Sequence, residues 1–558
     1  MSDLILGDDW LQPVHHLPGQ PFGAGSRERS TIVGILARQA HARPKAPFLT
    51  ELGDGRPHET ISYGQAHQAV QRRATLLRRW GLARGERVGV MGENSIHFAF
   101  AVLAILEAGG VAVLLNQHDP AARVAAHAVF TQTRFLLHSA ACTAAAEACA
   151  SSERTCAFEE FDRHATSLGC DAEVGYGAPK PTDGALIVLT SGTTGASKAV
   201  VQSQYSVARN AATVAGHHGI APGVRLLCVL PLHHVNGLEF TIFSVMLGGG
   251  HTVLSRGFDG LRFWTTVREH AIHIVSLVPN LLRLLADRPR RRGHEPLPLR
   301  YAVSAAAPLS IDIAERVRER LDLRIVQGYG LSEVTNFTCL MPVDLSAQAY
   351  RGWMLNGRRT SIGPALPGQE VEIHNTHGVA SPGEEGEIVI RGHCVMSGYL
   401  HNPAATEEAL RGGWFHSGDL GFYLPDDNGH RYVHVSGRLR EIAKRSGALV
   451  SLLELDEVLA SVPGVVDAGS AAFANTWVDE EVAALVVKEP GSALDEAAIV
   501  EHCRRVLPWS ALPKAIEFVD EIPRTASGKI RRGEIGQRFA GLRERLFVAS
   551  LPHAEVRV

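Results

Sequence analysis

Residues 185–201 read Ala-Leu-Ile-Val-Leu-Thr-Ser-Gly-Thr-Thr-Gly-Ala-Ser-Lys-Ala-Val-Val. The apolar run 185–189 predicts a buried strand, and the stretch 190–198 that follows it is rich in glycine and hydroxyl side chains and carries one lysine. Glycine lets the backbone approach a ligand closely, successive N–H groups form a concavity that binds anions, and a lysine adds a point charge. We therefore expect this loop to hold phosphate. The alternative is a polar turn between two strands, because 199–201 is apolar again.

The loop differs from a P-loop in three respects. A P-loop has four residues between its glycines, a lysine followed directly by Ser or Thr, and a helix after it. Here two residues separate Gly192 from Gly195, Ala199 follows Lys198, and the apolar residues after it predict a strand. The candidate phosphate-binding residues are Thr190, Ser191, Gly192, Thr193, Thr194, Gly195 and Lys198.

The composition is that of a globular protein with several domains. A chain of 558 residues is too long for one core, and 45% hydrophobic with 20% charged residues is ordinary for such proteins. The net charge of −3 gives no indication of a nucleic acid or an anionic membrane as a partner. The eight cysteines are scattered without a CxxC pair, which favours reduced thiols over a disulfide framework or a zinc site.

Neither end of the chain nor its longest apolar run predicts a membrane or export signal. The N-terminus has no basic segment followed by a long apolar one, and the C-terminus carries no peroxisomal or lipidation signal. The apolar run Phe98–Leu115 is interrupted by Glu107 and two glycines, so we expect a buried helix, a turn and a strand. The sequence thus predicts a cytoplasmic protein without a membrane span.

The order of apolar patterns predicts an α/β protein with a mainly parallel sheet. From about residue 30 to 480, expected strands (87–91, 185–189, 226–230, 274–278) alternate with expected helices (205–217, 261–270). After Gly363, short strands at 371–373 and 387–390 indicate a small β subdomain. Beyond residue 440, a helix at 453–459, a strand at 481–487, a helix at 496–506 and a strand at 515–519 indicate a small α+β domain. We therefore predict domains over 1–439 and 440–558.

A second candidate site follows the expected short strand 323–326. The segment Gln327–Glu333 offers the flat face of Tyr329, on which a purine could stack, and the carboxylate of Glu333, a hard oxygen ligand suited to Mg²⁺. The alternative is a tight turn around a core tyrosine.

The loop 190–198 resembles the phosphate-binding signature of the acyl-adenylating superfamily, which includes acyl-CoA synthetases, peptide-synthetase adenylation domains and beetle luciferases. Further motifs match in family order from about residue 30 to 540. The resemblance implies a large N-terminal domain of parallel sheets flanked by helices, a small β subdomain and a mobile C-terminal α+β domain. It also implies ATP, Mg²⁺ and a carboxylic acid as ligands.

Four more motifs resemble the family's nucleotide-binding segments. Residues 327–333 resemble its Tyr-Gly-x-Thr-Glu motif, with Ser332 in place of threonine. Residues 304–310 resemble its adenine-binding turn, with Ala305 where glycine is common, so the extra methyl would narrow the acyl pocket or adjust the backbone. In the motifs at 414–421 and 436–441, Asp419 would accept hydrogen bonds from both ribose hydroxyls and Arg438 would hold ribose or phosphate. The implied nucleotide-binding residues are Ala306, Ala307, Pro308, Gln327, Gly328, Tyr329, Gly330, Ser332, Asp419 and Arg438.

The resemblance assigns catalytic roles to Lys529, Glu333 and His234. Lys529, in the motif 523–530, would contact the acid's carboxylate and the α-phosphate and stabilise charge as the carboxylate attacks phosphorus. No protein nucleophile is then required. Glu333 would bind Mg²⁺.

His234, in the segment 231–237, would border the acyl pocket. The alternative for the pair His233-His234 is a metal site, for which no third ligand stands at a sensible spacing. The expected pocket wall is Val235, Asn236, Gly237, Leu238, Pro279, Asn280, Ala305 and Gly328, with Asn336 and Phe337 nearby. Most of these side chains are small or apolar, which favours an aryl, polycyclic or medium-chain acid over acetate.

The family mechanism implies a ligase with two steps. A hinge near Arg440 would swing Lys529 out and bring in Lys444–Gly447, with Lys444 and Gly447 serving thioester formation. Family hinges are usually Asp or Lys, so Arg440 is a departure. Coenzyme A is the expected acceptor, because 444–447 resembles the thioester-forming region and no carrier domain follows. The alternatives are an amine, a separate carrier protein, and a nucleotide sensor without activity; a homodimer is left open.

Overall fold

The computed structural model describes residues 11–53, 58–149, 151–168, 178–190, 198–287, 297–357, 359–445, 448–525, 528–545 and 547. The chain divides into two compact units. The first comprises Met1–Glu372, Val389–Ser417 and Leu424–Val433, and the second comprises Ile373–Ile388, Gly418–Tyr423 and His434–Val558. The domain boundary between residues 439 and 440 stays a prediction; it lies shortly after His434, from which the rest of the chain belongs to the second unit.

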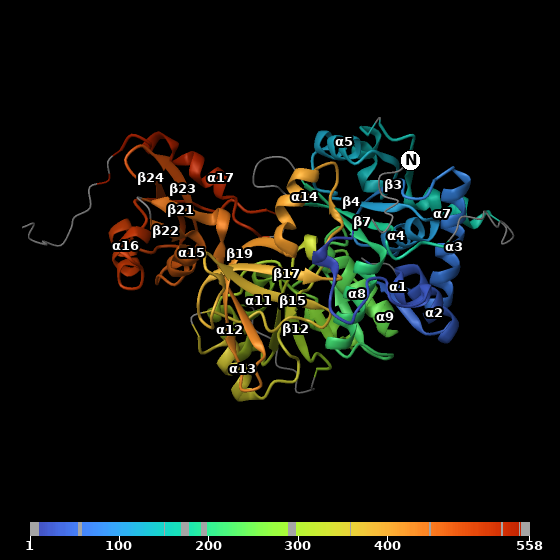
Figure 1. Cartoon of the computed structure of the whole chain (residues 1–558), viewed down its shortest axis with the longest axis horizontal. Coiled ribbons are helices and arrows are strands. Elements are labelled where there is room, and N and C mark those ends of the chain that lie inside the picture. The colour runs from blue at the N-terminus through green and yellow to red at the C-terminus, as the bar shows by residue number, and fades with distance from the viewer. Residues whose placement is uncertain are drawn as a thin grey trace, which may run out of the picture. The chain divides into compact units, whose positions relative to one another are not determined.

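A mainly parallel sheet contains the two strands that lead into and out of the 190–198 loop (Figure 1). Its strands in spatial order are β18 (Gly398–Tyr399), β8 (Lys198–Ser203), β7 (Gly184–Thr190), β4 (Val111–Leu115), β3 (Arg87–Met91), β5 (Thr133–His138) and β6 (Arg154–Ala157). From β7 to β6 neighbouring strands run parallel, and β3 and β4 are buried along their whole length. Continuous apolar runs are what a sheet covered on both faces requires.

The predicted return to a strand after the loop is confirmed. Strand β8 pairs antiparallel with β7, so that Thr190 lies opposite Lys198. The two ends of the loop are therefore neighbours at the end of a β-hairpin. A P-loop, which is followed by a helix, would not give this arrangement.

A second sheet in the first unit positions the other nucleotide motifs. Its order is β14 (Cys339–Leu340), β13 (Arg324–Tyr329), β12 (Tyr301–Ser304), β11 (Ile274–Ser276), β9 (Arg225–Cys228), β10 (His251–Leu254), β1 (Pro47–Glu51) and β2 (Glu59–Ser62). Strands β13 to β1 are parallel. The expected strands 226–230 and 274–278 end two residues early, just before the segments that lead to Pro231 and Pro279. Ligands bind at the carboxyl ends of such strands.

The predicted helix, turn and strand over 98–115 are confirmed. Helix α4 (Ile96–Ala108) begins where the Ser95 hydroxyl accepts the Phe98 N–H, and it ends at Gly109, whose φ of 87° is in the left-handed region that favours glycine. Strand β4 follows directly. Within the described ranges, no helix is both long and apolar enough to cross a membrane.

The other helices of the first unit include those predicted at 205–217 and 261–270, which the structure has as α8 and α10. Their bounds are α1 (Arg27–Ser30), α2 (Ile32–Ala42), α3 (Tyr63–Arg79), α5 (Ala121–Phe130), α6 (Thr143–Glu147), α7 (Phe158–Thr166), α8 (Gln204–His217), α9 (Val245–Gly248), α10 (Phe263–Glu269), α11 (Pro279–Asp287), α12 (Ile311–Leu321), α13 (Ala347–Met354) and α14 (Pro403–Ala409).

The predicted small β subdomain is confirmed by a five-stranded sheet. Its order is β16 (Gly378–Val379), β15 (Gln369–Asn375), β17 (Gly386–Gly392), β19 (Phe415–Pro425) and β20 (Arg431–Arg438). Residues of this sheet are divided between the two units. Strand β19 carries Asp419, and β20 ends at Arg438.

The C-terminal part has the expected α+β character. Its elements are β21 (Ile442–Arg445), β22 (Ala448–Ser451), α15 (Leu452–Ala460), β23 (Val465–Asn475), β24 (Asp479–Lys488), α16 (Glu496–Arg504), β25 (Ala515–Phe518) and α17 (Arg532–Arg538). The sheet order is β22, β21, β24, β23, with β25 also paired to β24. Strand β23 was not predicted, because its alanines, glycine and serine have low strand propensity. Pairing with β24 along its whole length overrides that propensity.

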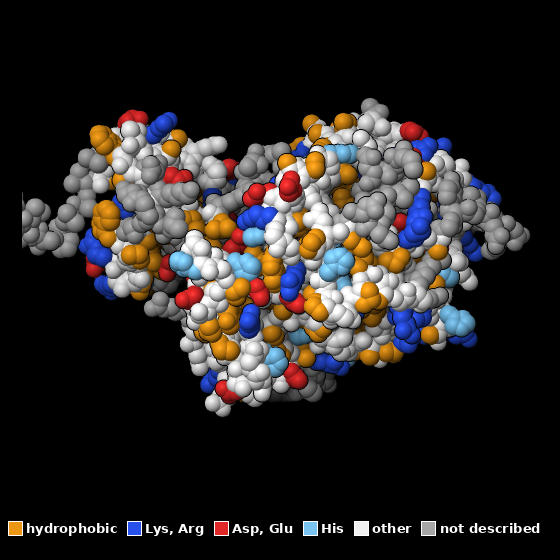
Figure 2. Space-filling view, viewed as in Figure 1, with side chains coloured by type: hydrophobic (Ala, Val, Ile, Leu, Met, Phe, Trp, Pro, Cys, Tyr) orange, Lys and Arg blue, Asp and Glu red, His pale blue; other side chains and the backbone are white. Residues whose placement is uncertain are grey.

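On the face shown in Figure 2, the described Lys and Arg side chains are interspersed with Asp and Glu side chains. This agrees with the net charge of −3.

Candidate active site

The described ends of the 190–198 loop fix where the phosphate candidates lie. Thr190 ends β7 and Lys198 begins β8, and the Thr190 hydroxyl donates to the Lys198 carbonyl at 3.3 Å. The ammonium group of Lys198 lies 4.3 Å from the ring centroid of Tyr399 on the neighbouring strand β18. The candidates between them (Ser191, Gly192, Thr193, Thr194 and Gly195) lie outside the described residues.

The same tyrosine brings Glu333 to Lys198. The Tyr399 hydroxyl donates to Glu333 Oε1 at 3.0 Å, while the ring of Tyr399 lies against Lys198. Tyr399 is buried, with 8% of the residue's surface exposed, so both contacts are held by a fixed ring. The structure thus joins two predicted site residues, 135 positions apart in the numbering, through a third that the sequence analysis missed. No local signal marks Tyr399, because its role arises from strand pairing.

Strand β13 extends further than expected, through Tyr329. Gln327, Gly328 and Tyr329 therefore lie in the strand itself, and the turn begins at Gly330. We call residues 332–335 the Glu333 turn; it opens with a 3₁₀ segment, Ser332–Val334, and the Glu333 carbonyl accepts the Met396 N–H at 2.7 Å.

The two glycines of this motif are required by close packing. A Cβ on Gly330 would lie 1.5 Å from the Asn336 carbonyl oxygen. A Cβ on Gly328 would lie 2.6 Å from side-chain atoms of Leu340 and Phe337. Both distances are far below van der Waals contact, so larger residues would displace the turn that carries Glu333.

The backbone of the candidate adenine turn is strained at Ala306, the residue after Ala305. Ser304 ends β12, and Ala306 has φ of 70°, in the left-handed region, whereas Ala305 does not. Ala305 is buried, Ala306 and Pro308 are exposed, and Ala307 is half-buried. The position where glycine is common in the family therefore tolerates alanine here. A narrowing of the acyl pocket by its methyl stays a prediction.

The acyl-pocket candidates begin a π-helix, Asn236–Ser244. Val235 precedes it, and Asn236, Gly237 and Leu238 form its first turn. Such helices are rare and often mark functional sites. A Cβ on Gly237 would lie 2.2 Å from the Pro231 carbonyl oxygen, so glycine permits the close approach of the preceding loop.

Two polar side chains in this region are buried as a pair. The Ser276 hydroxyl at the end of β11 hydrogen-bonds with Asn236 Oδ1 at 2.8 Å. Nearby on α11, Pro279 is buried and Asn280 is exposed.

His233 and His234 lie side by side, with ring centroids 4.4 Å apart. His233 is buried, and burial, reinforced by His234, holds the pKa of His233 well below its usual range. His234 is half-buried, and its backbone N–H donates to the Pro231 carbonyl.

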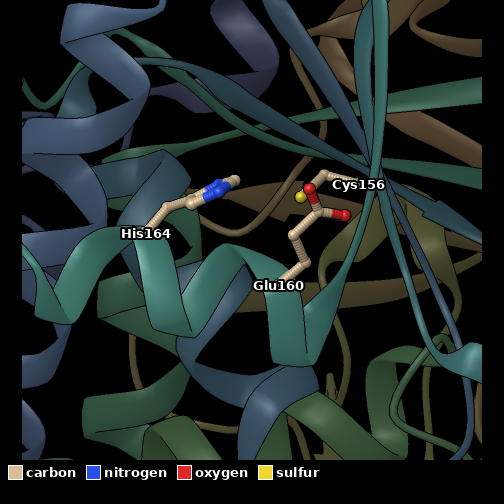
Figure 3. Close-up of side chains that lie close together, drawn as sticks. All are labelled: Cys156, Glu160 and His164. Carbon is tan, nitrogen blue, oxygen red and sulfur yellow. The ribbon is translucent and has the colours of Figure 1, made fainter.

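Neither histidine belongs to a group of potential metal ligands among the described residues. The group found there is Cys156, Glu160 and His164, whose ligand atoms lie within 4.8 Å of one another; Figure 3 shows Glu160 and His164 on one helix, facing the thiol. Burial raises the pKa of Cys156 to about 12, so this thiol keeps its proton at neutral pH.

The ribose candidates form an ion pair in the second unit. Arg438 Nε lies 2.6 Å from Asp419 Oδ1, and only 4% of the Asp419 side chain is exposed. Gly418 precedes it with φ of 70°, and its N–H donates to Glu387 Oε1 at 2.9 Å. The structure therefore brings together Asp419, expected at the ribose hydroxyls, and Arg438, expected at ribose or phosphate.

Lys529 lies exposed on a turn of the second unit. The Thr525 N–H donates to the Lys529 carbonyl at 2.8 Å, and the Lys529 N–H donates to the Thr525 hydroxyl at 3.1 Å. An ion pair between Arg524 and Asp467, 2.7 Å long, anchors the turn. Arg440 lies in the short segment Leu439–Glu441 and Lys444 in β21; the side chains of both, and all of Gly447, lie outside the described residues.

Comparisons with known proteins agree with these motifs. The family model "AMP-binding enzyme" matches residues 36–400, and the model "AMP-binding enzyme C-terminal domain" matches residues 454–529. A feruloyl-CoA synthase of Amycolatopsis is 30% identical over 504 residues, covering 90% of this chain and 98% of that protein. A probable CoA ligase of Humulus lupulus is 27% identical over 526 residues, covering 91% and 96%. A sulfoacetate–CoA ligase of Cupriavidus necator is 32% identical over 358 residues, covering 63% and 67%.

Among solved structures, ATP-bound MatB from Rhodopseudomonas palustris superposes with a TM-score of 0.82 at 24% identity, covering 92% of this chain and all of that one. That likeness shows the fold. The first family model spans more than half of the sequence. The chain therefore belongs to the AMP-binding enzyme family, and the relatives that it matches over most of its length are CoA ligases.

Proposed function

We propose that this chain is an AMP-forming carboxylic acid–CoA ligase. It joins a carboxylic acid to ATP as an acyl-adenylate, with release of pyrophosphate, and then transfers the acyl group to coenzyme A, with release of AMP. The observation that carries the proposal is the arrangement of Lys198, Tyr399 and Glu333. A cation and a carboxylate oriented by one buried tyrosine suit the phosphates of ATP and the Mg²⁺ that accompanies them.

Each step balances without a protein nucleophile. In the first, a carboxylate oxygen of the acid forms a bond to the α-phosphorus, and the bond from that phosphorus to pyrophosphate breaks. In the second, the thiol sulfur of coenzyme A bonds to the acyl carbon, its proton goes to solvent, and AMP leaves. The protein's task is to position the reactants and to stabilise the charge that builds up on the phosphates.

We assign Lys198 and Glu333 to the phosphate end of the nucleotide. Lys198 would neutralise phosphate charge as a point cation, with its position set by the Tyr399 ring. Glu333 is a single, half-exposed carboxylate that accepts one hydrogen bond from Tyr399. One such ligand fits Mg²⁺, which keeps several waters and binds mainly through phosphates. When bound, Mg²⁺ supplies charge neutralisation on those phosphates.

We assign Asp419 and Arg438 to the ribose, and Lys529 to the α-phosphate and the acid's carboxylate. The pairing with Arg438 orients the Asp419 carboxylate. Lys529 is exposed on an anchored turn, which suits a cation that contacts the substrate only during adenylation. Arg440, Lys444 and Gly447 would serve the swing to the thioester step.

The relatives bear on the acceptor, and the pocket candidates bear on the acid. Relatives named as CoA ligases favour coenzyme A over an amine or a carrier protein. The acids in their names differ widely, from oxalate and sulfoacetate to ferulate and long-chain fatty acids. We expect an aryl, polycyclic or medium-chain acid because most of the pocket candidates are small or apolar. The hydrogen-bonded pair Asn236–Ser276 adds one buried polar group to the candidate pocket wall.

The test is ATP–pyrophosphate exchange across a panel of aryl, medium-chain and small polar acids, followed by mass spectrometry with coenzyme A or with amines. We expect exchange with at least one acid and an acyl-CoA product. Exchange with an amide product, and none with coenzyme A, would move the chain to the amide synthetases. Nucleotide binding without exchange for any acid would contradict adenylation and favour a nucleotide sensor.

A further inference from the structure

Glu239 is a buried carboxyl group for which the proposed reaction has no use. It lies in the π-helix Asn236–Ser244 with 1% of its surface exposed, and neither of its carboxyl oxygens has a hydrogen-bond partner. Among the residues that the structure describes, no lysine, arginine or histidine forms an ion pair with it. Burial therefore raises the pKa of Glu239 well above its usual range. A buried carboxylate without a cation would be strongly destabilising, so this group carries a proton.

Gln202 on β8 lies close enough to this carboxyl for its side chain to oppose the rise in the pKa of Glu239, and burial outweighs that effect. Gln202 is fully buried. Its Nε2 donates to the Ser332 carbonyl at 2.9 Å and to the Thr335 carbonyl at 3.2 Å, while its Oε1 has no partner. The amide cannot be turned over, because its oxygen would then face two carbonyl oxygens.

One proton on Glu239 would give the unpartnered oxygen atoms of Gln202 and Glu239 a hydrogen bond to each other. Gln202 Oε1 and both oxygens of Glu239 are acceptors, and an ionised carboxylate has no proton to offer. A protonated Glu239 has one O–H, which can donate to Gln202 Oε1. That single proton gives Gln202 Oε1 a hydrogen-bond donor. The amide N–H groups of Gln202 continue to donate to the carbonyls of residues 332 and 335.

Those two carbonyls bracket Glu333, and the segment that they belong to is strained. Thr335 is a β-branched residue with φ of 71° and ψ of −74°, and the Asn336 N–H donates across it to the Val334 carbonyl at 3.0 Å. This is the geometry of a strained γ-turn. Such a conformation persists only where the surroundings determine it.

The Glu333 turn is held by the Gln202 amide and by two further hydrogen bonds. The Thr335 hydroxyl donates to the Cys394 carbonyl at 2.7 Å, and the Met396 N–H donates to the Glu333 carbonyl at 2.7 Å. Gln202 is the contact that reaches both ends of the Glu333 turn from the buried side.

We propose that Glu239 is a positioning residue: a neutral carboxylic acid that fixes the Gln202 amide and, through it, holds the Glu333 turn in the conformation that presents its carboxylate. The inference rests on the proposed function only in its last link, the use of Glu333 for Mg²⁺. A protonated carboxyl, rather than an apolar side chain, is needed there because it can donate a hydrogen bond to the buried Gln202 Oε1.

The first experiment tests the proton and does not depend on activity. Infrared difference spectroscopy of the full chain against Glu239→Gln, near neutral pH, should show the carbonyl band of a buried protonated carboxylic acid that the variant lacks. If the wild-type protein shows only a carboxylate band at this position, the proposal is wrong.

The second experiment tests the positioning. Pyrophosphate exchange is measured against Mg²⁺ concentration for wild type, Glu239→Gln, Glu239→Leu, Gln202→Leu and the double Leu variant. Glu239→Gln keeps a neutral donor and should match wild type. Glu239→Leu should need about tenfold more Mg²⁺ for half-saturation, as expected for one lost buried hydrogen bond, with kcat at saturating Mg²⁺ little changed.

The double variant tests whether Glu239 acts through Gln202 or only through its packing. If Glu239 acts through Gln202, removing both should be no worse than Gln202→Leu alone. Additive losses, or a Glu239→Leu variant that loses thermal stability while its Mg²⁺ requirement stays that of wild type, would overturn the proposal. A wild-type protein without exchange for any acid would instead count against the proposed function, while the infrared result would still decide the protonation state.

Discussion

Tyr399→Phe removes one hydroxyl from the contact that joins Lys198 to Glu333. The lost interaction is a 3.0 Å hydrogen bond to a carboxylate. Hydrogen bonds to charged groups contribute about 1.5–3 kcal/mol, and the half-exposed position of Glu333 favours the lower end. About 1.5 kcal/mol corresponds to roughly a tenfold change in an equilibrium constant. We therefore expect about tenfold more Mg²⁺ to be needed for half-maximal pyrophosphate exchange.

The phenylalanine ring keeps the contact with Lys198, which separates the two functions of Tyr399. Tyr399→Leu loses the ring as well and should lower exchange by a further factor of about three, since a cation–π contact with a partly exposed lysine contributes at least about 0.5–1 kcal/mol. Tyr432→Phe is the matched control, because Tyr432 is also buried but its ring stacks on Trp353, with the ring centroids 4.0 Å apart. A Tyr399→Phe enzyme with the Mg²⁺ dependence of wild type would refute the reasoning.

Three further predictions concern separate parts of the chain. Lys529→Ala should reduce adenylation by about 10²-fold or more and largely spare thioester formation from supplied acyl-adenylate; equal losses in both half-reactions would contradict the division of roles. Gly330→Ala should abolish exchange, because its Cβ would lie 1.5 Å from a carbonyl oxygen, whereas Gly352→Ala, which meets no atom within 4 Å, should not. Burial lowers the pKa of His15 and of His251 from 6.5 to about 4. The unfolded chain then binds more protons between these values, so the unfolding free energy should fall by up to about 3 kcal/mol per histidine as the pH drops from 6.5 to 4; a melting temperature constant over that window would contradict this.

The interpretation of the loop at 190–198 could be made from the sequence because its signals are local. An apolar run, a cluster of glycines and hydroxyls, and a second apolar run predict a strand, an anion-binding loop and a returning strand, and the structure has β7 and β8 there. The motif around Glu333 and the alternation of strands and helices are local in the same sense. These features depend on neighbours within a few residues, which is the range over which propensity and periodicity act.

Features that depend on long-range pairing could not be predicted from the sequence. Strand β23 is built from weak strand formers and exists because β24 pairs with it. In the adenine turn, Ala306 is the residue in the left-handed region, and nothing in the sequence predicted this. A turn's dihedral angles depend on how both of its ends are held, and residue identity alone does not specify that.

The sequence by itself determined the fold class, the order of the motifs and the family to which the chain belongs. Only the tertiary structure decided which side chains support them. Tyr399 reaches Lys198 and Glu333 through the pairing of β18 with β8, and Gln202 reaches the carbonyls of residues 332 and 335 from a strand about 130 positions earlier. The physical reason is that burial and hydrogen-bond satisfaction are properties of assembled neighbours. The sequence contains Glu239, but its enclosure without a cation, and so its proton, follows from the packing around it.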